Sequence, residues 1–210
     1  MAYDEEYFRT LYGAVPKQSR FDRARDDRVV GLVRRLAPPA RPDSTLLDIG
    51  CGYGYLLARF RGRYRLCGID LSVQAAKQTL GNLPDCLILQ ADVQRPLPFK
   101  QRFDVVLAIN VIEHLPDPIA GVRSIQEALL PGGLCVIHLP TINGPVSRLI
   151  YRFAYAGDPT HVYRPSGAEV RRLFENTGFE TARSSFAPHT AWLLSGTGWH
   201  PAYLAAFRRL

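Results

Sequence analysis

The sequence predicts an α/β domain whose sheet is doubly wound, mostly parallel and covered by helices on both faces. From residue 45 onward, short apolar runs alternate with segments of helical length, which is the pattern of strand–helix–strand units. The strongest run, Phe103–Asn110 (FDVVLAIN), is apolar on both faces, as expected for a strand buried on both sides of a parallel sheet. A glycine-rich turn joins the first run to a helical segment, as at the ligand-binding edge of such sheets.

The elements follow in order along the chain. Residues 1–36 are predicted to be helical up to the proline-rich stretch at 38–43, which no helix can cross. We expect strands at Thr45–Gly50, Leu66–Asp70, Cys86–Gln90, Phe103–Asn110, Leu134–Leu139 and Phe179–Phe186. We expect helices at Gly54–Arg63, Val73–Asn82 (capped by Ser72), Ile119–Leu130, Val146–Ala156 and Ser166–Thr177. A last strand is uncertain, because residues 187–210 have only weak strand character, around Thr190–Leu194.

The composition excludes a disordered or a fibrous chain. The 210 residues are 47% hydrophobic and 21% charged, as in an ordinary globular domain. The net charge of +7 can attract nucleic acid, an anionic membrane or a phosphorylated substrate, but we favour the interpretation that it is a solvated arginine-rich surface. The four cysteines lack metal-ligand spacing and are too sparse for a disulfide framework. With no signal peptide and no apolar run of 18 residues, we expect a cytoplasmic protein.

The glycine turn reads Asp48-Ile49-Gly50-Cys51-Gly52-Tyr53-Gly54. Glycine lets the backbone lie directly against a ligand. A dinucleotide site would require glycine at the sixth position, where Tyr55 stands, so an NAD-dependent oxidoreductase is disfavoured. The carboxylate of Asp48 would also suit an ammonium group better than a pyrophosphate.

Two more acids follow the next two strands. Asp70 ends the second predicted strand, where a carboxylate can accept hydrogen bonds from both hydroxyls of a ribose. Asp92 follows the third strand, where it could accept from an adenine amino group. Together with the glycine turn, these acids predict a site for a nucleoside that carries a cationic group and no phosphate.

The motifs resemble those of the class I S-adenosylmethionine-dependent methyltransferases, of the type that acts on small molecules. The matching segments are Leu47–Gly54, Asp70, Ala91-Asp92, Phe103–Val106, Asn110–His114 and Leu130–Gly133. The resemblance is close over about residues 44–140 and looser over 158–180. It implies a Rossmann-like sheet of seven strands that usually finishes with an antiparallel hairpin. It also implies one domain, with an N-terminal helical cap or lid (1–43), a cofactor-binding core (44–140) and acceptor-side elements with a C-terminal tail (141–210).

The resemblance further implies S-adenosylmethionine as the cofactor and assigns nine residues to it. Those implied at its methionine end are Gly50, Cys51, Gly52 and Asn110, with Asp48 ordering the loop or meeting the ammonium. Those implied at its nucleoside are Asp70 at the ribose and Leu71, Asp92 and Val93 at the adenine.

Methyl transfer from a sulfonium is an in-line displacement, so alignment of the acceptor can supply much of the rate. A hydroxyl acceptor would gain from a general base. The candidates are His114, just past the fourth strand, and His161, before the helix at 166–177, although either could be purely structural. The adjacent pair Glu113 and His114 is too small a ligand set for a metal, and we predict no metal site.

The leading hypothesis is therefore methyl transfer to an oxygen, nitrogen or carbon of a small-molecule acceptor, by a monomer or a homodimer. A nucleic-acid methyltransferase is the first alternative. The positive charge favours it, but Asn110–Glu113 (NVIE) lacks the Asn/Asp-Pro-Pro-aromatic motif usual in enzymes that methylate base amino groups, so we expect no nucleic-acid partner. The second alternative is a non-catalytic protein that binds the cofactor. The aromatic and arginine residues of the tail leave contact with a membrane surface open.

Overall fold

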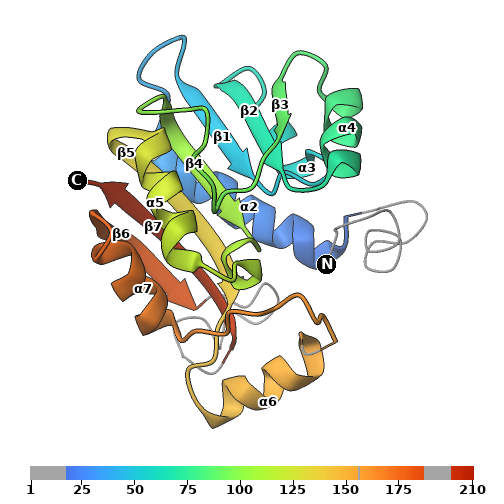
Figure 1. Ribbon diagram of the computed structural model, residues 1–210, viewed down its shortest axis with the longest axis vertical. Coiled ribbons are helices and arrows are strands. Elements are labelled where there is room, and N and C mark those ends of the chain that lie inside the picture. The colour runs from blue at the N-terminus through green and yellow to red at the C-terminus, as the bar shows by residue number, and fades with distance from the viewer. Residues whose placement is uncertain (1–17, 156, 187–199) are drawn as a thin grey trace.

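The computed structural model describes residues 18–155, 157–186 and 200–210. Seven strands form a sheet in the order β3-β2-β1-β4-β5-β7-β6 (Figure 1). They are β1 (Thr45–Ile49), β2 (Arg65–Asp70), β3 (Leu87–Gln90), β4 (Phe103–Ile109), β5 (Leu129–Pro140), β6 (Phe179–Phe186) and β7 (Ala202–Arg209). The first five run parallel, and β7 is antiparallel to both of its neighbours. This confirms the predicted mostly parallel, doubly wound sheet.

Helices cover both faces of the sheet (Figure 1). They are α2 (Arg20–Leu36), α3 (Tyr55–Ala58), α4 (Val73–Asn82), α5 (Pro118–Ala128), α6 (Pro145–Ala154) and α7 (Gly167–Glu175), with a short 3₁₀ turn η1 (Ile112–His114). Successive residues of a strand point to opposite faces. In β5, Val136 accordingly joins the apolar cluster beneath α2 and α3, whereas Ile137 joins the cluster beneath α5 and α7.

Several helix starts follow from local sequence. The side chain of Ser72 caps α4 by accepting a hydrogen bond from the backbone N–H of Ala75 (3.3 Å), as predicted. Asp117 caps α5 in the same way, through the N–H of Ala120 (3.0 Å). Such side chains satisfy N–H groups that have no partner within the first turn of the helix. These caps fix where the chain turns after each strand.

The structure corrects three predicted boundaries. The helix expected at 54–63 ends as α3 at Ala58, and the chain then turns through Gly62 at φ +71°. The strand expected at 134–139 begins earlier, because Leu129 already pairs with Phe103 before the register shifts. The last strand, β7, lies at 202–209 and inserts between β5 and β6. The weak strand expected around residues 190–194 falls outside the described residues, as do residues 1–17 of the expected cap.

The carboxyl ends of β1, β2 and β4 point toward one side of the sheet, and α6 lies beyond that side, apart from the sheet (Figure 1). The segments that follow β1, β2, β3 and β4 therefore meet at a single edge of the sheet. That edge holds the candidate site.

Among the described residues, no helix has both the length and the apolar character needed to cross a bilayer.

Candidate active site

A cleft of about 500 Å³ opens at the carboxyl ends of β1 to β4. Open α/β sheets bind ligands at this edge, and the volume suits a small molecule. A larger hollow of about 1350 Å³ lies at the opposite end, around Arg65 and Phe103. We assign the site to the smaller cleft, because the larger hollow contains none of the residues predicted to bind or react.

Eight of the predicted site residues line the cleft, and three do not. The eight are Gly50, Gly52, Asp70, Leu71, Asp92, Val93, Asn110 and His114. The three that are not in the lining are Asp48, Cys51 and His161. The cleft lining includes no lysine or arginine among the described residues, and it includes two aspartates. This charge pattern suits a cationic nucleoside and not a phosphate.

The glycine turn brings bare backbone to the cleft wall. Gly50 has φ +68°, and a Cβ atom there would lie 2.7 Å from Cγ2 of Val111. Gly52 has φ +54°, and a Cβ atom there would meet nothing within 4 Å. Gly52 also lines the cleft, so its backbone is exposed to a ligand there. Glycine is therefore needed at Gly50 for packing and backbone conformation, and at Gly52 for conformation and for close approach of a ligand.

Asp70 ties the glycine turn to the end of β2. Its Oδ2 accepts a hydrogen bond from the N–H of Gly52 (2.9 Å), and its Oδ1 accepts one from the N–H of Ser72 (2.9 Å). Burial raises the pKa of Asp70, and these backbone hydrogen bonds oppose the rise. A carboxylate oxygen can accept more than one hydrogen bond. Two backbone N–H groups thus hold the carboxylate of Asp70 at the wall of the cleft.

Asp48 and Cys51 lie behind the turn. Asp48 is 3% exposed within β1, and burial raises its pKa well above the ordinary value, assisted by the charges of Asp26 and Asp70. The side chain of Cys51 is buried, with its Sγ 3.8 Å from Oγ1 of Thr79. Asp48 and the side chain of Cys51 are therefore buried beside the cleft and are not part of its lining.

Asp92 and Asn110 border the cleft from the ends of β3 and β4. Oδ1 of Asp92 accepts a hydrogen bond from the N–H of Gln94 (2.9 Å). Asn110 has φ +56°, a conformation that few residues other than glycine adopt. Its Oδ1 lies 2.6 Å from Nδ1 of His138, and its N–H donates to the carbonyl of His138 (2.7 Å). His138 is a positioning residue that the sequence did not reveal, because 28 residues separate it from Asn110.

His114 stands at the other end of the cleft, held by Thr160. Its Nδ1 lies 2.8 Å from Oγ1 and 3.2 Å from the carbonyl oxygen of Thr160. The hydroxyl of Thr160 donates to Oδ1 of Asp158 (2.5 Å). Both Thr160 oxygens therefore accept from Nδ1–H, which assigns the lone pair to Nε2. Burial lowers the pKa of His114, so the imidazole is neutral near pH 7.

His161 lies behind His114, with the two ring centroids 4.8 Å apart. It is 7% exposed, and its Nδ1 lies 2.9 Å from the hydroxyl of Tyr151. Burial lowers its pKa to about 4, with a further contribution from His114. His161 therefore acts on the cleft only through its neighbours.

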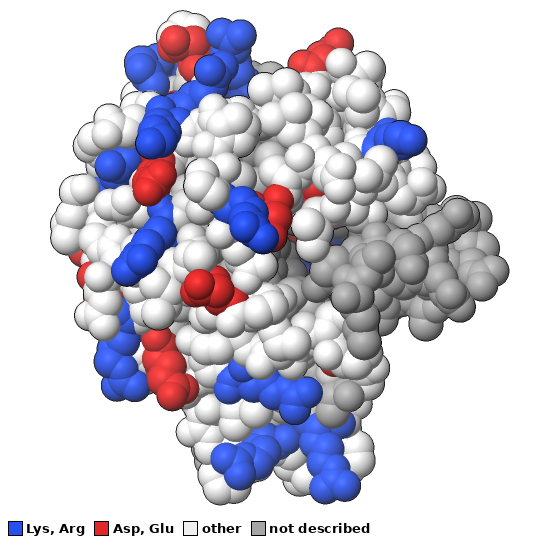
Figure 2. Space-filling model, in the orientation of Figure 1, with Lys and Arg blue, Asp and Glu red and all other residues white. Residues whose placement is uncertain are grey.

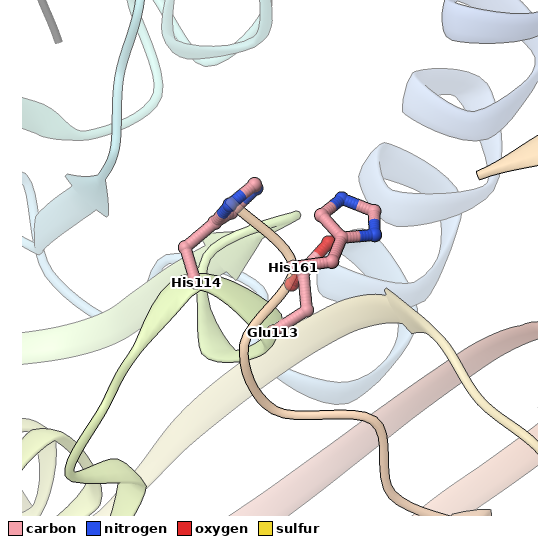
Figure 3. Close-up of side chains that lie close together, drawn as sticks. All are labelled: Glu113, His114 and His161. Carbon is pink, nitrogen blue, oxygen red and sulfur yellow. The ribbon is translucent and has the colours of Figure 1, made fainter. Parts of the chain in front are cut away.

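Glu113 completes a cluster that sequence patterns did not predict. Figure 3 shows Glu113, His114 and His161 directed toward one another from η1 and from the loop before α7. Glu113 is 0% exposed, and neither of its carboxyl oxygens has a hydrogen-bond partner among the described residues. Burial raises its pKa to about 8. In the sequence, a lone acidic residue in a 3₁₀ turn gives no sign of this burial.

A family model described as a methyltransferase domain matches residues 21–184. The chain is 31% identical to a tRNA U34 carboxymethyltransferase of Tolumonas auensis over 71% of this chain and 49% of the relative. It is 28% identical to the enzyme of the same name from Klebsiella pneumoniae over 66% and 44%. The chain thus spans about half the length of these curated relatives.

The fold is also that of solved methyltransferases. The magnesium protoporphyrin IX methyltransferase of Synechocystis PCC 6803, solved with bound SAH, superposes with a TM-score of 0.71 at 15% identity, over 99% of this chain and 96% of that one. At that identity the likeness concerns the fold alone. It agrees with the predicted seven-stranded sheet that ends in an antiparallel strand.

Proposed function

We propose that this chain, which belongs to the class I S-adenosylmethionine-dependent methyltransferase family, methylates an oxygen nucleophile of an RNA nucleotide. The cofactor of the family is S-adenosylmethionine, whose sulfonium supplies an electrophilic methyl group. The observation that carries the proposal is a cleft with carboxylates at the nucleoside end and a neutral histidine cluster at the other end.

The cofactor end of the cleft is proposed to bind and orient. Asp70 would accept from the ribose hydroxyls, and Asp92, Leu71 and Val93 would hold the adenine. The backbone of Gly50, Cys51 and Gly52 would lie along the methionine part, with Asp48 beneath it. Asn110, locked by His138, would reach the same part. Fixed alignment of this kind can supply several kcal/mol of the barrier reduction for an in-line displacement.

The acceptor end is proposed to activate the nucleophile. His114 lines the cleft next to Thr160, Leu115 and Pro159. A neutral Nε2 there can take a proton from a hydroxyl as a general base, or it can help to hold a cation that lowers the pKa of that hydroxyl. His161 would position His114 from behind.

RNA is proposed as the acceptor because the relatives at 28% and 31% identity are named as tRNA-modifying enzymes. They favour RNA over the small-molecule acceptor that the sequence predicted. The charge of α6 also supports RNA, because Arg148 and Arg152 are exposed and residues 141–157 contain no acid. Figure 2 shows basic side chains gathered over this helix. Because the sequence lacks the motif for amino methylation, an oxygen acceptor is favoured over a base amino group.

The test is transfer of tritium from methyl-labelled S-adenosylmethionine to bulk tRNA, compared with a low-molecular-mass cell extract. We expect label in the RNA, located by digestion to nucleosides and mass spectrometry. The Asp70→Ala variant should incorporate far less. Label found only in low-mass compounds would overturn the RNA proposal.

A small-molecule acceptor is the second candidate. It is favoured by the apolar residues at the acceptor end of the cleft, which include Leu115, Pro116, Pro159 and Val162. The same labelling experiment distinguishes the two acceptors. For either acceptor we propose a cytoplasmic enzyme, supported by four unpaired cysteines, three of them buried.

A further inference from the structure

Glu113 is buried where an ionised carboxylate is energetically unfavourable unless a positive charge or hydrogen-bond donors stabilise it. It is fully buried, and both of its oxygens lack a hydrogen-bond partner among the described residues. A buried carboxylate is normally paired, coordinated to a cation or neutralised by a proton. The side chains of His114 and His161 lie close to it (Figure 3), and a neutral imidazole supplies a lone pair but no positive charge.

The three side chains have the geometry of a ligand set. One potential ligand atom from each of Glu113, His114 and His161 lies within 4.8 Å of the others. In a tetrahedral site with bonds of about 2.1 Å, ligand atoms lie about 3.4 Å apart. The observed spacing exceeds this value by up to about 1.4 Å, so the ligand atoms would have to approach one another when an ion binds. From the sequence, only the adjacent pair Glu113 and His114 could be considered as metal ligands. In the structure, His161 adds a third potential ligand to that pair.

The groups around the cluster are those that support metal ligands. Nδ1 of His161 faces the hydroxyl of Tyr151 (2.9 Å), and Nδ1 of His114 faces Oγ1 of Thr160 (2.8 Å). Metal-bound histidines are usually oriented by such a contact to the other ring nitrogen. Asp158, whose Oδ2 lies 3.8 Å from Nε2 of His161, adds negative charge close by.

We propose that Glu113, His114 and His161 bind one divalent transition-metal ion next to the acceptor end of the cleft. Two imidazoles and one carboxylate favour ions such as Zn²⁺, Co²⁺ or Fe²⁺ over Mg²⁺ and Ca²⁺, which prefer oxygen ligands. Three protein ligands leave a coordination position open. Since His114 borders the cleft, an ion held by these residues would lie next to the acceptor end of the cleft.

This inference rests on the proposed function and specifies how the acceptor is activated. A cation at the cluster would polarise an acceptor hydroxyl and lower its pKa. The hydroxyl proton passes to water, the oxygen forms a bond to the methyl carbon, and the carbon–sulfur bond breaks to leave a neutral thioether. His114 then serves as a ligand, and the cation takes the place of an imidazole base.

The experiment measures metal binding by the full chain, without reference to turnover. Protein treated with EDTA and dialysed is titrated with Zn²⁺ by calorimetry and with Co²⁺ by visible absorption. We expect one ion per chain with micromolar affinity or better, and cobalt absorption bands typical of nitrogen and oxygen ligands. Glu113→Gln and His161→Gln should each weaken Zn²⁺ binding at least tenfold.

Cys86→Ser is the matched control, because Cys86 is a partly exposed thiol that could bind metal adventitiously. It should leave the affinity and the stoichiometry unchanged. Binding of S-adenosylmethionine by each variant verifies that the protein is folded, since Glu113 and His161 do not line the cleft.

The proposal is overturned if the wild type binds no Zn²⁺ at tens of micromolar. It is also overturned if both ligand variants bind as tightly as the wild type, or if Cys86→Ser abolishes binding. Should RNA methylation persist in metal-free protein, the proposed function stands and the role of the metal in activating the acceptor is rejected. Should metal bind normally while no RNA is methylated, the choice of acceptor is rejected and the metal site stands.

Discussion

The two ends of the cleft are built in different ways. At the cofactor end, backbone groups do most of the holding, as where the N–H groups of Gly52 and Ser72 orient Asp70. At the acceptor end, side chains hold one another across long stretches of chain. His114 and Thr160 are 46 residues apart, and Tyr151 contacts His161 from α6.

This difference predicts different tolerances to substitution. A backbone-built end depends on a few conformations that only particular residues allow, and damage there affects both folding and cofactor binding. A side-chain network can lose one member and still bind the cofactor, while catalysis declines. The following substitutions test that division.

The largest effect is expected for Gly50→Ala. The new Cβ would lie 2.7 Å from Val111 in a backbone with φ +68°. Strain of about 1–2 kcal/mol and overpacking of about 1–3 kcal/mol should lower the free energy of unfolding by roughly 2–5 kcal/mol. Displacement of the turn should weaken S-adenosylmethionine binding at least about tenfold. Urea unfolding and calorimetry measure the two effects.

Gly62→Ala is the matched control for Gly50→Ala. Gly62 also has positive φ (+71°), but a Cβ there meets nothing within 4 Å, and the residue lies away from the cleft. It should cost only the strain of about 1–2 kcal/mol and leave cofactor affinity unchanged. Equal loss of cofactor affinity in the two variants would contradict the role given to the turn.

Asp70→Ala comes next. It removes the proposed ribose contact and releases the N–H groups of Gly52 and Ser72. We expect calorimetric affinity for S-adenosylmethionine and S-adenosylhomocysteine to fall at least about tenfold, or about 1.4 kcal/mol. Asp85→Ala is the control, because Asp85 is exposed and pairs with Arg61 away from the cleft. Unchanged affinity in Asp70→Ala would remove this residue from the site.

A smaller effect, confined to catalysis, is expected for Tyr151→Phe. The substitution deletes the hydroxyl that contacts Nδ1 of His161. Loss of one such hydrogen bond, about 0.5–1.5 kcal/mol, should lower kcat about threefold to tenfold with no change in cofactor Kd. Tyr155→Phe is the control, since Tyr155 stacks on His161 (centroids 6.2 Å apart) and contributes ring contact. A loss of cofactor affinity in Tyr151→Phe would show that the two ends are not independent.

The smallest effect is expected for the double substitution Arg148→Gln and Arg152→Gln on α6. If these exposed side chains contact phosphates, KM for tRNA should rise about twofold to fivefold. The slope of log affinity against log salt concentration should become shallower by about 1–2 units, because a complex with fewer phosphate contacts releases fewer counterions when it forms. Arg34→Gln with Arg35→Gln, exposed at the end of α2, is the control. An identical salt dependence in both double variants would argue against α6 as an RNA contact.

Most of the sheet and most of the cofactor end were readable from the sequence. Strand limits such as Phe179–Phe186 and the helix Val73–Asn82 agree with the structure, because apolar periodicity and caps act over a few residues. The acids Asp70 and Asp92 were found because strands of a parallel sheet end at one edge. The assignment of all nine predicted residues to parts of the cofactor stays a prediction.

The last strand was not readable in the same way. Residues 202–207 are all buried between β5 and β6, yet this segment follows a stretch rich in glycine and proline and is partly alanine. Alanine has weak strand preference. Pairing with two neighbours makes it a strand, and one of them, β5, ends more than 60 residues earlier in the sequence.

By itself the sequence determined the parallel core, the glycine turn and the acids at the strand ends, because each depends on local periodicity, on backbone freedom or on the common direction of the strands. Only the tertiary structure decided that the side chain of Glu113 is buried with no hydrogen-bond partner among the described residues, that His161 lies behind His114, and that His138 locks Asn110. These contacts join residues up to 47 positions apart. No local pattern can specify them, because burial and pairing across such distances arise only when the chain packs.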